Sequence, residues 1–210
     1  MNTITAHVEI HPEQLAGALS PATLAKALFE KLAAPAEVGT NTPTKASTPP
    51  ALGAMWPEQG GIYAGVMRSE WGHHYHLIIS PIDTEFSDTE WGEDDKMISG
   101  AINDRDGLSN SLAIRDYAKS TQKRFPAACL LLSLTCNGFN DWYLPARHEL
   151  RLAYLNASEV FNLDGWYWSS TQYAGYASYA WVQTFDDGYQ YYYDKGYKGR
   201  VRAVRRFMID

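Results

Sequence analysis

Long apolar runs are missing from this chain of 210 residues. None approaches the roughly 18 consecutive apolar residues that cross a bilayer, so we expect no membrane span and no membrane insertion. Basic residues are also outnumbered, because the chain has 18 Lys and Arg and 24 Asp and Glu, which gives a net charge of −6. This balance argues against nucleic acid as a partner. Residues 1–7 lack the basic start and apolar core of a secretory signal, which predicts synthesis in the cytoplasm without a signal peptide.

Cysteine is scarce. Cys129 and Cys136 are the two cysteines of the chain, and their spacing fits neither a CxxC nor a CxxH motif. They lie around the apolar run at residues 130–132, which favours buried free thiols over a disulfide or a reactive pair.

Recognisable catalytic and metal-binding patterns are missing as well. The histidines at residues 73–76 have no clear third and fourth ligand, so surface histidines are favoured over a zinc site. Residues 83–95 carry seven acids without a ligand spacing, which favours a solvated acidic loop over a cation site. His148 and Glu149 stand at an expected helix start with no nucleophile in a recognisable context. We therefore expect no enzyme, no catalytic residue, no metal and no cofactor.

Tyrosine and tryptophan are what this chain has in excess. It holds 14 Tyr and 7 Trp, and eight of the tyrosines fall within residues 173–197. So local a concentration of aromatic side chains requires a physical explanation.

The pattern along the chain predicts three parts. Residues 1–34 form a short helical N-terminal segment whose apolar stripe is too small to be buried alone, which favours self-association into a homo-oligomer. Residues 35–57 are a Pro/Thr-rich linker. Residues 58–210 form the main domain.

Within the main domain, the alternation of apolar residues predicts strands over 60–67 and 75–79, joined by a turn at Gly72. A helix is expected over 109–134, interrupted at Pro126, and another after Pro145. From Trp166 onward we expect short strands, with a hairpin turn at 186–188 and a closing strand over 201–207. Helices enclosed between antiparallel strands make an α+β fold in which the ends of the main domain lie close together.

Several short motifs, taken in order, carry a family resemblance. Residues 141–150 read DWYLPARHEL, which is similar to the DWxLPxxxEL block of the collagen-like-protein C-terminal domain family. Residues 106–110 (DGLSN), 167–171 (YWSST) and 200–205 (RVRAVR) occur in the expected order, and the resemblance covers roughly residues 60–207. It implies a C-type-lectin-like fold for the main domain.

The same motif residues can also be interpreted as determinants of the fold, independently of the family resemblance. Trp168 and Trp181 would fill the core, and Arg200, Arg202 and Arg205 would form internal pairs rather than a phosphate-binding patch.

The segment 173–197 resembles a paratope, because Tyr, Ser, Gly and Asp provide large amphipathic contacts at low entropic cost. Three consecutive tyrosines cannot all be buried on one face of a strand, so some tyrosine surface must be exposed. The predicted partner is a protein or glycan receptor on a cell surface, and we expect these residues to bind it: Tyr173, Tyr176, Ser178, Tyr179, Val182, Thr184, Asp186, Asp187, Tyr189, Tyr191, Tyr192, Tyr193, Asp194 and Tyr197.

This interleaving of aromatic and small residues resembles the variable proteins of diversity-generating retroelements. That resemblance implies a C-type-lectin scaffold whose binding codons are mutated by a reverse transcriptase, and an association with a virion or prophage. Undiversified members of the collagen-like-protein family carry similar residues here, so diversification stays open at this point.

Three other interpretations remain. The tyrosines could form cross-strand pairs of an ordinary exposed sheet. The domain could be a fixed structural or adhesin module of a phage tail or cell surface. An enzyme of the formylglycine-generating type is a distant third, because no cysteine follows the Leu144-Pro145 block. A calcium-dependent sugar site is not expected, since neither Glu-Pro-Asn nor Trp-Asn-Asp occurs.

Overall fold

The structure, a computed structural model, describes residues 48–93 and 95–209. The predicted helical segment 1–34 and the first part of the predicted linker lie outside these residues. None of the described helices is long and apolar enough to span a membrane.

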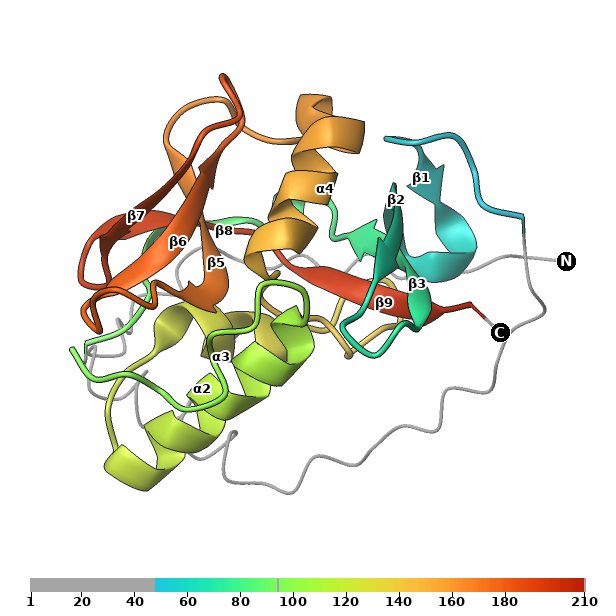
Figure 1. Ribbon diagram of the computed structural model, residues 1–210. Helices are drawn as coiled ribbons and strands as arrows, with labels where there is room; N and C mark the ends of the chain where they lie inside the picture. The colour runs from blue at the N-terminus through green and yellow to red at the C-terminus, as the bar shows by residue number, and fades with distance from the viewer. Residues whose placement is uncertain (1–47, 94, 210) are drawn as a thin grey trace, which may run out of the picture. The chain divides into compact units, whose positions relative to one another are not determined.

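The strands form two sheets (Figure 1). One has four antiparallel strands in the order β1-β2-β3-β9, and the other has five in the order β4-β8-β5-β6-β7, with β5 and β8 parallel. The strands are β1 Met55–Trp56, β2 Gly61–Arg68, β3 His74–Ile79, β4 Phe86–Glu90, β5 Trp166–Gln172, β6 Tyr179–Thr184, β7 Gln190–Asp194, β8 Lys198–Val201 and β9 Val204–Met208.

Helix α4 stands between the two sheets, with β2 on one side and β5 and β6 on the other (Figure 1). Helices α2 and α3 pack against the five-stranded sheet through β5 and β4. The expected break at Pro126 is confirmed, because this proline occupies the first turn of α3, where its missing N–H costs nothing. The helices are α2 Gly107–Thr121, α3 Pro126–Leu132 and α4 Arg147–Ala157, with short 3-10 turns at Pro57–Gln59, Ile82–Thr84 and Ser158–Val160.

The predicted hairpin is confirmed as β2 and β3, with Gly72 at a φ of 83° in the turn. The folded region begins earlier than the predicted linker boundary at residue 57. Met55 and Trp56 pair with β2, and Trp56 is only 1 % exposed against the rings of Tyr63 and His76. Burial of this indole explains why the sheet starts inside a proline-rich stretch.

The closing strand predicted over 201–207 is two strands in different sheets. β8 joins the five-stranded sheet and β9 joins the four-stranded one. Between them Arg202 is buried and donates to the carbonyl oxygens of Ser80 and Val160. A buried guanidinium requires such acceptors, and they hold the chain at the crossing.

The prediction of internal arginine pairs is confirmed. Arg200 Nη1 lies 2.8 Å from Glu85 Oε1, and Arg205 makes a two-pronged pair with the Asp141 carboxylate at 2.7 and 2.9 Å. The expected acidic loop over 83–95 is therefore partly wrong. Phe86–Glu90 forms strand β4 on β8, because the pairing of Glu85 with Arg200 draws this stretch onto the sheet.

Glu149 is a buried hub whose role the sequence did not reveal. Its Oε1 accepts from the phenols of Tyr75 at 2.7 Å and Tyr143 at 2.8 Å, and its Oε2 accepts from the N–H groups of Ala146 at 2.7 Å and Gly107 at 3.2 Å. One carboxyl thus joins β3, the 141–146 segment and the first turns of α2 and α4. Burial raises the pKa of Glu149 to about 7, even though these hydrogen bonds lower it.

Cys129 and Cys136 are free, as expected, but both are partly exposed rather than fully buried. Burial nevertheless raises the pKa of each thiol, so neither is an activated nucleophile.

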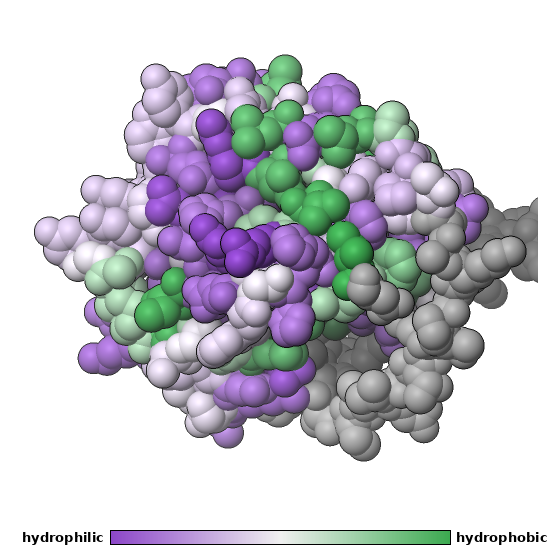
Figure 2. All heavy atoms as spheres, turned by 45° about the vertical axis from the view of Figure 1, so that its right-hand side comes forward, coloured by the Kyte–Doolittle hydropathy of each residue, from purple (hydrophilic) through white to green (hydrophobic). Residues whose placement is uncertain are grey.

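A hydrophobic band crosses the face where α4 meets the four-stranded sheet (Figure 2). A Cβ on Gly65 would lie 3.3 Å from Leu52 and 2.7 Å from the amide nitrogen of Asn156, so these segments meet there. Leu52 and Leu155 are exposed beside this point.

Candidate functional site

The Tyr-rich segment builds the β6–β7 ribbon at the outer edge of the five-stranded sheet. The predicted turn at 186–188 is confirmed, with Gly188 at a φ of 76°. A Cβ on Gly188 would come within 2.3 Å of the Tyr154 ring, so glycine is required both by the backbone and by the close approach to α4. Because side chains alternate along a strand, the tyrosines divide between the two faces of the ribbon.

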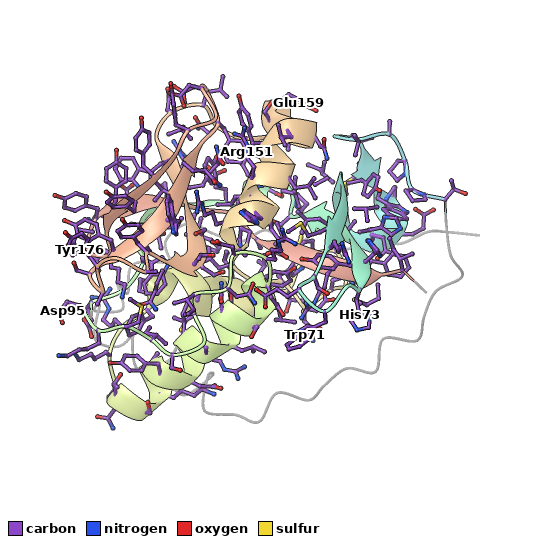
Figure 3. The ribbon with its side chains drawn as sticks, viewed as in Figure 1. Trp71, His73, Asp95, Arg151, Glu159 and Tyr176 are labelled. Atoms are coloured by element: carbon purple, nitrogen blue, oxygen red, sulfur yellow. The ribbon has the colours of Figure 1, made fainter. Side chains whose placement is uncertain are left out.

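One face carries what we call the aromatic face: Tyr173, Tyr176, Tyr179, Trp181 and Tyr192. Tyr173 and Tyr192 stack in parallel with ring centroids 4.0 Å apart, and Trp181 meets both edge-on at 5.4 and 5.7 Å. Tyr179 packs edge-on against Tyr176 and Tyr192. Tyr176 is 63 % exposed and points outward from the ribbon (Figure 3). The rings are therefore held in place by one another, yet leave a broad aromatic surface in solvent.

Helix α4 fixes the aromatic face from beneath. The Arg147 guanidinium lies 3.5 Å from the centroid of Trp181, and its Nε donates to Gln190 Oε1 at 3.0 Å. Gln190 Nε2 donates back to the Arg147 carbonyl at 2.9 Å. This closed pair ties β7 to the first turn of α4 and sets the position of Trp181.

The opposite face carries what we call the second cluster: Trp166, Tyr189, Tyr191, Tyr193 and Tyr197. The ring centroid of Tyr193 lies 4.7 Å from that of Trp166 and 6.3 Å from that of Tyr197. Near the turn, the ring centroids of Tyr189 and Tyr191 are 5.6 Å apart. Tyr189 and Tyr197 are each 57 % exposed. The predicted binding tyrosines thus form two surfaces, one on each side of the ribbon.

Several other predicted site residues build the ribbon. Val182 is buried with 1 % exposure in the core, so the expectation that it contacts ligand is corrected. Asp187 accepts from the Thr184 hydroxyl and from the Tyr189 N–H, which hold the pKa of this carboxyl below its ordinary value and stabilise the turn. Asp194 accepts from the Gly196 N–H at 2.9 Å and shapes the next turn.

Acidic groups mark both ends of the ribbon. Asp186 is exposed beside Asp187 at the turn. At the other end, Asp194 and Ser178 line a hollow of about 140 Å³ together with Glu93, Asp95 and the buried Lys195. Within the described residues, no group of three or more His, Cys, Asp and Glu has an arrangement that could hold a metal ion.

Reasoning from the sequence missed two members of the site. Trp181 was assigned to the core, but it is partly exposed in the aromatic face; its alternation with Tyr179 along one strand was the available signal. Arg147 carried no local signal, because its contact with Trp181 depends on how α4 packs against β6.

The fold is a mixed α/β module of three described helices and two sheets, with an exposed aromatic ribbon at one sheet edge. Residues 88–205, more than half of the chain, match the family model of the Lcl C-terminal domain, and the chain belongs to that family. The collagen-like-protein resemblance is thereby confirmed.

Among solved structures, a fimbrial protein from Bacteroides ovatus ATCC 8483 is similar over 65 % of this chain and 36 % of its own, with a TM-score of 0.44 and 13 % sequence identity. This chain thus spans about a third of that protein's length. No relative of this chain is found among the curated proteins.

Proposed function

We propose that this chain is a non-catalytic, adhesin-type binding module that recognises a receptor on a cell surface through the tyrosines of the β6–β7 ribbon. The observation that carries the proposal is the aromatic face. Its stacked rings are ordered before any ligand arrives, so little side-chain entropy is lost on binding. Clustered exposed aromatic surface is uncommon on a protein without a partner.

The same geometry argues against tyrosines that serve only as cross-strand pairs. Such pairs stabilise a sheet by burying one another, whereas Tyr176, Tyr189 and Tyr197 each remain more than half exposed. Tyrosine supplies both a flat apolar ring and a hydroxyl, which suits a protein surface or the face of a sugar ring.

We further propose that the main domain has a C-type-lectin-like scaffold. The ordered motifs support this, as does the sheet in which β3, near the start of the domain, pairs with β9 at its end. On this scaffold the buried residues of β5 and the exposed tyrosines of β6 and β7 are separate sets. A binding surface of this kind can vary while the scaffold stays constant.

This separation also supports the proposal that the segment is diversified by a retroelement. We expect the DNA around the gene to hold a second copy of the sequence encoding residues 168–205, differing from it where that copy carries adenine, beside a reverse-transcriptase gene. Sequencing a few kilobases on each side checks this. A flank with neither feature would leave a binder with one fixed partner.

The triple substitution Tyr173→Ala, Tyr176→Ala and Tyr192→Ala tests the binding surface. Each exposed anchor ring contributes on the order of 1 kcal/mol or more, so we expect at least about a 100-fold loss of affinity on arrays of purified cell-surface glycans and proteins. We expect the free energy of unfolding to fall by no more than about 2 kcal/mol, since these rings pack mainly on each other.

Trp71→Ala is the matched control. Trp71 is 82 % exposed on the β2–β3 hairpin, away from Tyr176 (Figure 3), so its substitution removes a large exposed aromatic ring from another surface. Equal loss of binding in this control, or unchanged binding in the triple variant, would favour the fixed structural module instead. A collapse of stability in the triple variant would favour the ordinary exposed sheet.

A further inference from the structure

Strand β7 is the outermost strand of the five-stranded sheet, and its main chain is open on the outer side. The Thr184 N–H donates to the Tyr189 carbonyl at 3.0 Å, and the Lys195 N–H donates to the Ser178 carbonyl at 2.9 Å. The pairs Thr184–Tyr189 and Ser178–Lys195 continue, at its two ends, the unbroken antiparallel register of β6 and β7. Because antiparallel strands bond through alternate residues, the main-chain groups of Gln190 and Tyr192 point away from β6. No described residue hydrogen-bonds them on that side.

This edge lacks three of the devices by which proteins protect exposed strands, namely proline, lysine and a bulge. Residues 190–194 read QYYYD and contain no proline and no lysine. The β6–β7 register runs without a bulge. The strand is flanked on both sides by aromatic rings, so an added strand would find apolar surface above and below it.

The division of the tyrosines between two faces has a consequence for the shape of the partner. The aromatic face and the second cluster lie on opposite sides of a single ribbon, and a flat partner reaches one of them at a time. The outer edge of β7 borders both, because Tyr192 belongs to one surface and Tyr191 and Tyr193 to the other. A partner that lies along this edge contacts both surfaces at once.

Charge restricts the partner further. Asp186 and Asp187 lie at the turn end of β7, and Asp194, Glu93 and Asp95 lie at the other end. Lys195 also lies at that end, but it is buried and its ammonium donates to the Lys96 carbonyl and the Gln172 side chain. An antiparallel second copy would place the acidic turn of one chain against the acidic end of the other, which electrostatics disfavours. An extended chain with basic residues at its ends meets opposite charge at both.

We propose that the edge of β7 binds an extended segment of a partner protein as a sixth strand of the sheet. The inference rests on the proposed binding function and specifies its ligand. The segment spans about five residues, or roughly 17 Å. It carries aliphatic or aromatic side chains that alternate between the two tyrosine surfaces, with Lys or Arg at its ends. Main-chain hydrogen bonds to Gln190 and Tyr192 supply part of the affinity, and the rings select the side chains.

A phage-displayed library of random linear 12-residue peptides, panned on the full chain, provides the probe. We expect selected peptides with alternating apolar residues flanked by basic ones. Gln190→Pro removes one outward N–H and blocks the approach of a strand, while Gln190→Ala removes the same side chain and keeps the N–H. We expect the proline variant to bind at least about 10-fold more weakly than the alanine variant, with a similar melting temperature.

N-methylation of the selected peptide tests the same point without altering the protein. Methylating alternate residues should weaken binding at least about 10-fold, and methylating the residues between them should not, because only every second N–H faces β7. Three outcomes would overturn the inference. The first is a methylation profile without this two-residue period, the second is equal binding by the two Gln190 variants, and the third is a library that yields no linear binder. A dimer in sedimentation equilibrium that Gln190→Pro dissociates would assign the edge to a second copy instead.

These outcomes separate the inference from the proposed function. If the tyrosine triple variant loses array binding while Gln190→Pro keeps it, the aromatic face binds ligand and the strand-addition inference fails alone. If neither variant changes binding, both fail.

Discussion

Replacing Glu149 with alanine should destabilise the protein by about 3–5 kcal/mol, because the buried Tyr143 phenol and two buried N–H groups lose their acceptor together, and the Tyr75 phenol keeps only the Arg105 carbonyl. For a chain of this size, such a loss lowers the melting temperature by roughly 10 °C, measurable by circular dichroism or calorimetry. Tyr75 and Tyr143 are both fully buried, so the cavity left by the carboxyl offers them no direct path to bulk water.

Glu149→Gln is the matched control and tests the pH dependence. Its oxygen can accept from Ala146 and Gly107 while its amide donates to the phenols, so we expect a cost below about 1.5 kcal/mol at pH 7.

Since burial raises the pKa of Glu149 to about 7, the folded state binds the proton more tightly than the unfolded chain. The contribution of this carboxyl is thus fully present below about pH 4.5 and is lost as pH rises through 7, by roughly 3 kcal/mol. Glu149→Gln should abolish this slope; an unchanged slope would contradict the assignment.

Replacing Gly107 with alanine should cost about 2–4 kcal/mol. A Cβ at this position would lie 2.4 Å from Glu149 Oε2, 2.5 Å from the Ala146 nitrogen and 2.7 Å from the Leu144 carbonyl oxygen. Two of these neighbours are backbone atoms that cannot turn aside, so α2 would have to move away from the 144–146 segment. Urea unfolding measures the loss.

Gly138→Ala separates this collision from general glycine effects. Gly138 has a φ of 82° but nothing within 4 Å of its Cβ position, so only backbone strain of about 1 kcal/mol is expected. Equal losses in the two variants would show that close packing at Gly107 is not what requires glycine.

The local elements were predictable because their signals are local. The alternation in 60–67 and 75–79, Pro126 at a helix start and the turn at Gly188 each depend on a few neighbouring residues. What could not be predicted depends on pairing over long distances. Glu149 and Tyr75 are 74 residues apart, and the crossing between Val201 and Val204 places Arg202 against carbonyl groups from two remote segments.

The candidate site shows the same limit. The tyrosine content of 173–197 was sufficient to locate it, but the face that each ring occupies follows from the register of β6 on β7. That register pairs Trp181 with Tyr192 and buries Val182 opposite Tyr191. Composition alone predicts Val182 as a ligand contact and does not predict Trp181 as one.

The crossing from β8 to β9 also makes folding depend on translation of the last residues of the domain. Both sheets are completed by residues 198–208, which are translated after the whole tyrosine segment. A frameshift or stop codon within residues 173–197 therefore removes at least one strand from each sheet together with Arg202 and Arg205. The buried acceptors Ser80 and Gln59 then lose these donors. Such a chain cannot close its core and is open to proteolysis. The architecture thus makes closure of the core depend on an intact reading frame through the tyrosine segment.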